Sequence, residues 1–222
     1  SKEGSLQLEM VSATRQFGFM PYSDRGTLSS IMSLVKDDIP VIVFQNLSIQ
    51  LLPQWHYAVV IGFDSDKGTV TLHTGLTPNH EMSLELFERT WGRGNYWYLA
   101  PVPPNVTSPE MTPFTYVSAA YDMLKVGDKA RSLAFLETAS HTWPTYWLSY
   151  FLIANYYLEQ NDNQAVAWFE KGYEVGQHQH VYVHNYVLAL RENNMPEKAN
   201  TILKQGLERF PNNEPLLTLA EK

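Results

Sequence analysis

Residues 55–64 read WHYAVVIGFD, a histidine within an apolar run that ends in glycine, an aromatic residue and aspartate. The run is short and rich in β-branched and aromatic residues, which favours a strand over a helix. The stretch 64–68 contains aspartate, serine and glycine and predicts a hairpin turn, and residues 69–74 predict the returning strand. An antiparallel hairpin with His56 near its open end therefore organises this part of the chain.

The flanking residues extend the hairpin into an α+β domain over residues 1–100. Two further strands and three helices are expected. They span residues 41–45 and 96–99 (strands) and 6–17, 27–36 and 84–91 (helices). Ser5 and Ser83 are the expected N-caps of the first and last of these helices. Helices combined with an antiparallel meander are typical of the α+β class.

Residues 101–112 are rich in proline and predict a linker. After them the pattern is helical only, and it repeats. Ala165 and Ala199 begin similar segments 34 residues apart, and Ser132 takes the same place one unit earlier. This period resembles the tetratricopeptide repeat, in which small residues let paired helices approach closely. We expect three repeats over residues 113–212 and the start of a capping helix at Glu214; an unrelated helical bundle is the alternative.

Composition excludes several classes of protein. The net charge is −7 and the sequence has no basic run, so a nucleic-acid partner is not expected. No apolar segment approaches the roughly 20 residues that a membrane span needs. The chain has 7 histidines and no cysteine, which excludes disulfides and thiolate metal sites. His178, His180 and His184 lack the glutamate of a metalloprotease pattern. We expect neither a metal nor another cofactor.

His56 has two interpretations. A histidine at the start of a buried strand has its backbone fixed by the sheet while its ring faces the sheet edge, as a general base requires. A structural histidine in a half-buried strand is the alternative. Gln45 is interpreted as a hydrogen-bonding residue at the end of its strand.

Residues 4–99 resemble the papain-like peptidases that process double-glycine leaders of bacteriocins. The resemblance is carried by residues 56–64, by 70–75, and by Phe87 and Trp91. Residues 4–7, 18–22, 43–47 and 53–60 are similar to a bacterial subgroup that fuses this domain to C-terminal tetratricopeptide repeats. The resemblance implies a truncated papain-like cysteine-peptidase-like domain followed by an all-α repeat solenoid.

The resemblance also implies site residues. The nucleophile of the family is a cysteine in a segment before the equivalent of Gly4, so the domain as given lacks it and is expected to be inactive alone. His56 is the implied base. The family's acidic third residue falls at Thr74, and His73 is the alternative, because a one-residue change of register exchanges the two faces of a strand. Asp64 and Asp66 are excluded as turn residues, roughly 26 Å along the strand from His56 at about 3.3 Å per residue.

Two functions remain open. In the first, the chain is the C-terminal part of a bacterial cysteine peptidase, and its repeats hold a peptide or protein substrate. In the second, the domain is an inactive peptidase-like scaffold, and the chain is a protein-binding adaptor. Aromatic residues are dense in the middle repeat, where they either pack between helices or line a binding groove. The resemblance implies a location in the bacterial cell envelope or periplasm, with a lipid anchor supplied by sequence before Ser1.

Overall fold

The computed structural model describes residues 2–48 and 51–221. The chain divides into two compact units, residues 1–131 and 132–222. The expected domain limits, residues 1–100 and 113–222 with a linker at 101–112, stay a prediction.

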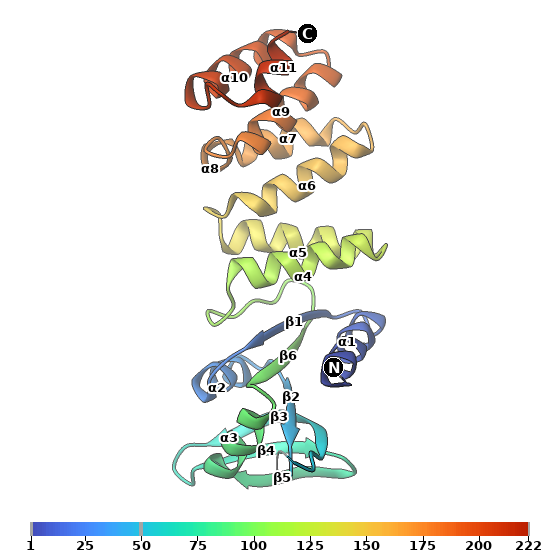
Figure 1. Ribbon diagram of the computed structural model, residues 1–222, viewed down its shortest axis with the longest axis vertical. Coiled ribbons are helices and arrows are strands. Elements are labelled where there is room, and N and C mark those ends of the chain that lie inside the picture. The colour runs from blue at the N-terminus through green and yellow to red at the C-terminus, as the bar shows by residue number, and fades with distance from the viewer. Residues whose placement is uncertain (1, 49–50, 222) are drawn as a thin grey trace. The chain divides into compact units, whose positions relative to one another are not determined.

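The first unit is built on a six-stranded antiparallel sheet with the order β1-β6-β2-β3-β4-β5 (Figure 1). The strands are β1 (Met20–Arg25), β2 (Val41–Asn46), β3 (Trp55–Asp64), β4 (Thr69–Thr74), β5 (Thr77–Ser83) and β6 (Trp97–Val102). Its helices are α1 (Lys2–Gln16), α2 (Leu28–Lys36), α3 (Leu84–Arg93) and α4 (Pro113–Lys125). The α+β class and the antiparallel sheet are confirmed.

Several details differ from the sequence-based expectation. α1 begins at Lys2, so Ser5 lies inside the helix and is not its cap, whereas Ser83 does cap α3 by accepting a hydrogen bond from the backbone of Leu86 at 3.3 Å. β1 and β5 were not predicted. They are the two edge strands, and their sequences MPYSDR and TPNHEMS lack the apolar alternation of a half-buried strand. β6 also continues through Val102, into the expected linker.

The two faces of the sheet are covered by different helices. Val43 and Ala58 are cross-strand partners on the face that contacts α2 and α3. Phe44 and Trp97 lie on the opposite face, in a cluster that includes Met10 of α1. Figure 1 shows α1 and α2 on either side of the sheet. Helices therefore shield both faces of the central strands from water.

Residues that follow the sheet are bonded back to β1 and to Asp37 at the end of α2. The Ser108 hydroxyl donates to the Asp37 carboxylate at 2.5 Å, and the backbone N–H of Thr112 donates to the Tyr22 hydroxyl at 3.0 Å. The Thr115 hydroxyl on α4 donates to Asp24 at 3.1 Å. These bonds fix the end of the proline-rich segment and the start of α4 on β1.

Two repeated pairs occur among the remaining helices. These helices are α5 (Lys129–Thr142), α6 (Trp147–Glu159), α7 (Gln164–Lys171), α8 (Tyr173–Gly176), α9 (His180–Glu192), α10 (Pro196–Arg209) and α11 (Glu214–Ala220). α6 pairs with α7 and α8, and α9 pairs with α10. Asn161 and Asn194 both have positive φ, 54° and 56°, at the turn between the paired helices. The small residues expected at helix contacts, Ser132, Ala165 and Ala199, are all fully buried.

Glycines set the close approach of these helices. A Cβ on Gly172 would lie 2.5 Å from Tyr150 of α6 and from Tyr182 of α9, and a Cβ on Gly206 would lie 2.6 Å from Val183 of α9. A helix of each pair therefore packs on its own partner and on the first helix of the next pair. This arrangement, with its spacing of 34 residues, is tetratricopeptide-like. No helix among the described residues is long and apolar enough to cross a membrane.

Candidate functional site

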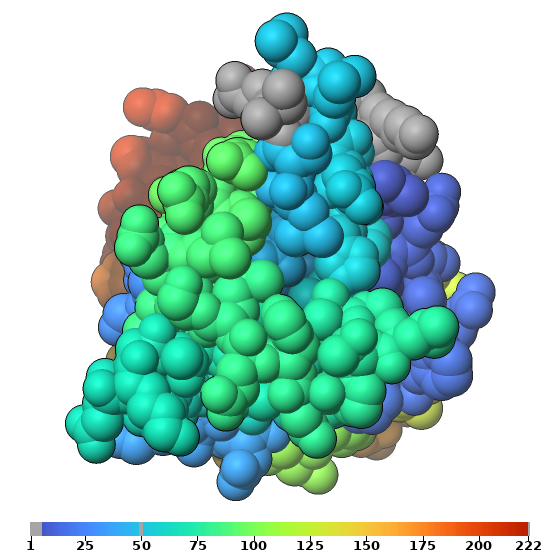
Figure 2. Space-filling model, turned by 90° about the horizontal axis from the view of Figure 1, so that it is seen from below, coloured from blue at the N-terminus to red at the C-terminus, as the bar shows by residue number. Residues whose placement is uncertain are grey.

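His56 lies near the start of β3, where its cross-strand partner is Gln45 of β2. Its side chain is half-buried. Figure 2 shows the segment that enters β3, in cyan, projecting at the surface between α1 in blue and α3 in green. The sheet therefore fixes the backbone of a half-buried histidine, which is the placement that a general base needs.

The structure brings Thr74 to His56. The His56 Nε2 and Thr74 Oγ1 atoms lie 2.6 Å apart, at hydrogen-bond distance. Thr74 pairs with Ala58, two residues after His56, so both side chains point to the same face of the sheet. If the Thr74 hydroxyl accepts the Nε2 proton, the lone pair at Nδ1 is left to take a proton. Nδ1 has no hydrogen-bond partner among the described residues.

His73 lies elsewhere. It pairs with Val59, so it points to the face opposite His56. Its side chain is exposed, and its Nδ1 accepts a hydrogen bond from the backbone N–H of Asn79 at 3.2 Å. The register therefore brings together His56 and Thr74 and leaves His73 as a residue of the β4–β5 hairpin.

Gln45 completes the polar residues on the His56 face. It is buried, and its Nε2 donates to the Thr90 hydroxyl of α3 at 2.7 Å. The same hydroxyl lies 3.0 Å from the backbone carbonyls of Leu86 and Phe87. This side chain therefore ties β2 to α3, in keeping with its interpretation as a structural hydrogen-bonding residue.

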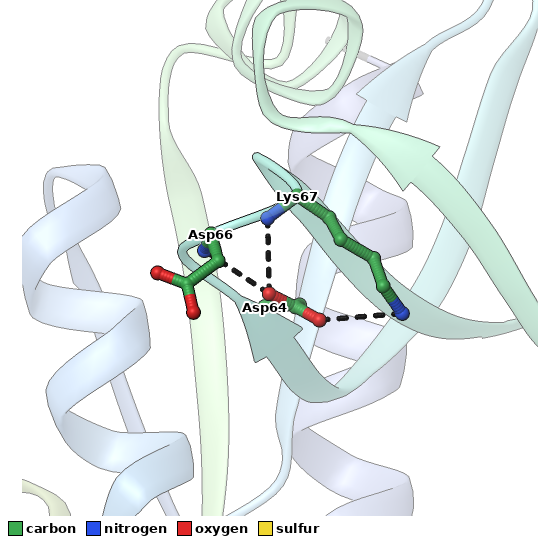
Figure 3. Close-up of polar contacts among 3 residues, drawn as sticks. All are labelled: Asp64, Asp66 and Lys67. Atoms are coloured by element: carbon green, nitrogen blue, oxygen red, sulfur yellow. Dashed lines mark hydrogen bonds and ion pairs between the residues drawn. The ribbon is translucent and has the colours of Figure 1, made fainter.

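Asp64 and Asp66 form the turn between β3 and β4 (Figure 3). The Asp64 carboxylate accepts hydrogen bonds from the backbone N–H groups of Lys67 and Asp66, both at 3.0 Å, and pairs with the Lys67 ammonium at 3.4 Å. The hydrogen bond from the Lys67 backbone is the main reason that the pKa of Asp64 lies below its usual value. This carboxylate stabilises the hairpin and does not reach His56.

A second polar site connects two repeats. The Asn185 amide of α9 donates to the Asn155 side-chain oxygen of α6 at 2.8 Å, and the Asn185 side-chain oxygen lies 2.8 Å from the His184 Nδ1. All three side chains are half-buried. The sequence pattern drew attention to His184 and missed both asparagines. No local pattern singles them out, because both helices carry other polar residues, among them Ser149 and Arg191.

The aromatic residues of the middle repeat are mainly packed together. Trp147 contacts Phe151 and Tyr182, and Tyr150 contacts Trp168. Tyr156 is half-buried and its ring contacts that of Tyr157. His178 and His180 are exposed at the start of α9, and the ring of His180 contacts that of Phe210.

Part of the chain is similar in fold to solved structures. No protein-family model matches the chain, and no curated protein matches it in sequence. Among solved structures, the N-terminal domain of stress-induced protein-1 (STI-1) from C. elegans is 18% identical, with a TM-score of 0.44, over 49% of this chain and 92% of that one. MamA protein is 16% identical, with a TM-score of 0.40, over 44% of this chain and 54% of that one. These scores are low, so the repeat assignment rests on the spacing and packing of this chain's own helices.

Proposed function

We propose that this chain is a protein-binding adaptor, in which the first helices of the repeats bind an extended peptide and the first domain is a scaffold. The observation that carries this proposal is the bonded set formed by Asn155, Asn185 and His184, which joins the first helices of two successive repeats. Side chains held in one geometry by mutual hydrogen bonds lose less entropy when they bind a ligand.

The set leaves hydrogen-bonding groups free for a ligand. The Asn185 oxygen is an acceptor, so the His184 Nδ1 donates to it, and the Nε2 of the neutral ring is left as an acceptor. The amide nitrogen of Asn155 has no acceptor among the described residues. A donor and an acceptor on neighbouring helices match the C=O and N–H groups that every extended peptide carries. Recognition of these backbone groups does not depend on the side chains of the bound peptide.

An apolar side chain on the same helix adds contact area. Val181, one turn before Asn185 on α9, is exposed by 39%. Exposed apolar residues beside fixed polar groups are the usual composition of a peptide-binding surface, in which burial supplies free energy and hydrogen bonds fix the orientation.

The test is selection of peptides from a random displayed library against the whole chain, followed by affinity measurement on variants. We expect Asn185→Ala to weaken binding of the selected peptides about tenfold, which is a loss of roughly 1.4 kcal/mol in binding free energy. The substitution removes the residue that orients Asn155 and His184 and leaves their hydrogen-bonding groups unsatisfied. Asn163→Ala is the matched control, since Asn163 is exposed at the start of α7 and makes no capping hydrogen bond. Equal affinities for the Asn185→Ala variant and the wild type would contradict the proposal.

A second candidate, a papain-like peptidase, is supported by the 2.6 Å contact between His56 and Thr74. A base oriented through one ring nitrogen, with the other free, is the arrangement that activates a thiol. Thr74 is uncharged, so it cannot offset the charge of an imidazolium as a carboxylate does. This reaction needs a cysteine from polypeptide outside the 222 residues.

The peptidase candidate is tested with the product of the complete reading frame. We expect a thiol-directed covalent probe to label it, and His56→Ala to slow the labelling at least tenfold at neutral pH, because the base that lowers the pKa of the thiol is lost. His73→Ala is the matched control, because His73 faces away from His56. Equal labelling rates for wild type and His56→Ala would leave only the adaptor function.

A further inference from the structure

A groove of about 550 Å³ lies between α1, β1 and α4 in the first unit, where both helices contact β1. Its volume is within the usual range of ligand-binding pockets. Val11 of α1 and Ala119 of α4 line it with apolar atoms, and so do the exposed side chains of Leu8 and Phe114. The groove therefore offers apolar surface that a ligand can cover.

A guanidinium group without a hydrogen-bond acceptor lines the same groove. The Arg15 side chain is 22% exposed, and its Nε atom is buried with no hydrogen-bond partner among the described residues. Its ion pair with Asp122 is long, with 3.8 Å between Arg15 Nη2 and the carboxylate oxygen, and Asp122 also pairs with Lys125. A buried donor that lacks an acceptor costs free energy, so a ligand that brings an acceptor relieves this cost.

The outer edge of β1 adds backbone hydrogen-bonding groups. β1 is an edge strand, and Pro21 lies opposite Pro101 of β6. Neither proline has an N–H, so this pair exchanges no hydrogen bonds, and the pair of Ser23 with Leu99 two residues later is of the same kind. The N–H and C=O groups of Ser23 therefore point away from β6, and no other described residue bonds to them. Ser23 lines the groove.

The charges that line the groove favour an uncharged acceptor. They are one guanidinium, that of Arg15, and two carboxylates, those of Asp24 and Asp122, so their sum is −1. An anionic ligand is repelled by the two carboxylates. The C=O group of a peptide bond accepts a hydrogen bond without carrying a charge, and the neighbouring N–H is the donor that the C=O of Ser23 lacks.

We propose that this groove binds an extended, uncharged segment of a partner protein. One carbonyl of the segment accepts from Arg15, its backbone pairs with Ser23, and an apolar side chain packs on Phe114. Extended peptides commonly add to a free sheet edge, where backbone hydrogen bonds give affinity and side-chain contacts give specificity. This site is separate from the peptide-binding helices of the repeats and does not depend on them.

The test is titration of a capped peptide, acetyl-Thr-Val-Thr-Leu-Thr-Val-Thr-amide, into the isotope-labelled whole chain. We expect saturable NMR shifts at Ser23 and Ala119, and slower hydrogen exchange of the Ser23 amide, because its N–H gains an acceptor. The same peptide with aspartate in place of the central leucine is expected to bind at least fivefold more weakly, since it loses the apolar contact and brings a repelled charge.

Substitutions separate the two kinds of contact. Arg15→Met removes the guanidinium donors and keeps an apolar stem, and we expect it to weaken peptide binding about tenfold. Phe114→Ala is expected to weaken binding about fivefold, and because Phe114 is 67% exposed this change leaves the fold intact. Arg89→Met makes the same chemical change at an exposed position of α3 and is the matched control, which should leave the affinity unchanged.

Any of four results would overturn the proposal. The first is that the leucine peptide causes no shift at millimolar concentration. The second is equal affinity of the wild type and Arg15→Met. The third is that the product of the complete reading frame fails to bind the peptide, which would mean that another part of the protein covers the groove. The fourth is dimerisation of the chain, seen by sedimentation and abolished by Phe114→Ala, which would assign the groove to a second copy.

Discussion

Trp91→Ala is expected to lower the free energy of unfolding of the first unit by about 3–5 kcal/mol. Trp91 is fully buried, stacks on Phe87 with ring centroids 5.7 Å apart, and donates from Nε1 to the backbone carbonyl of Trp97 at 2.8 Å. Alanine leaves a cavity between α3 and the sheet and removes the donor from a buried carbonyl, and both losses destabilise the fold.

Urea denaturation monitored by circular dichroism measures the free energy of unfolding. Hydrogen exchange of the α3 and β6 amides locates the change. Leu86→Ala provides the matched control on α3. Because Leu86 is 41% exposed, this substitution should lower the free energy of unfolding by less than about 1 kcal/mol. If the free energy of unfolding of the Trp91→Ala variant lay within 1 kcal/mol of the wild-type value, α3 would not depend on this contact.

The sequence was most informative for the repeats. Ser132, Ala165 and Ala199 predicted close helix contacts, and all three are fully buried. Such a prediction needs only local spacing, because each repeat packs on its neighbours in the same way. In the first domain, the central strands and the Ser83 cap were also predicted from local sequence. A strand buried on both faces is a short apolar run, and a helix cap depends on only a few neighbouring residues.

The features that were not predicted from the sequence depend on contacts between residues that are distant along the chain. β1 and β5 pair at the sheet edges, where backbone hydrogen bonds form without an apolar pattern. Counting along β4 identified Thr74 as the residue beside His56, but only the observed register separates it from His73. The contact of Asn155 with Asn185 joins residues 30 positions apart, and no local pattern marks it.

Phe169→Ala is expected to destabilise the second unit by about 3–5 kcal/mol. Phe169 is fully buried on α7, edge-on to Tyr182 at 5.3 Å and stacked on Tyr186 at 5.6 Å between ring centroids. Both tyrosines belong to α9, so the ring joins two repeats. Its loss removes burial together with the ring contacts, which add roughly 0.5–1.5 kcal/mol per aromatic pair. Urea denaturation, with hydrogen exchange of α7 and α9, measures the effect.

Leu203→Ala tests whether the same position behaves differently one repeat later. Leu203 is the counterpart of Phe169 at an offset of 34, but it is 5% exposed and lies at the edge of a surface groove between α9, α10 and α11. We expect a loss of about 2 kcal/mol, at the lower end for a buried leucine, because water and the flanking side chains can fill the space that the methyl groups leave. Equal losses for Leu203→Ala and Phe169→Ala would contradict this expectation and would mean that the two positions are equally well packed.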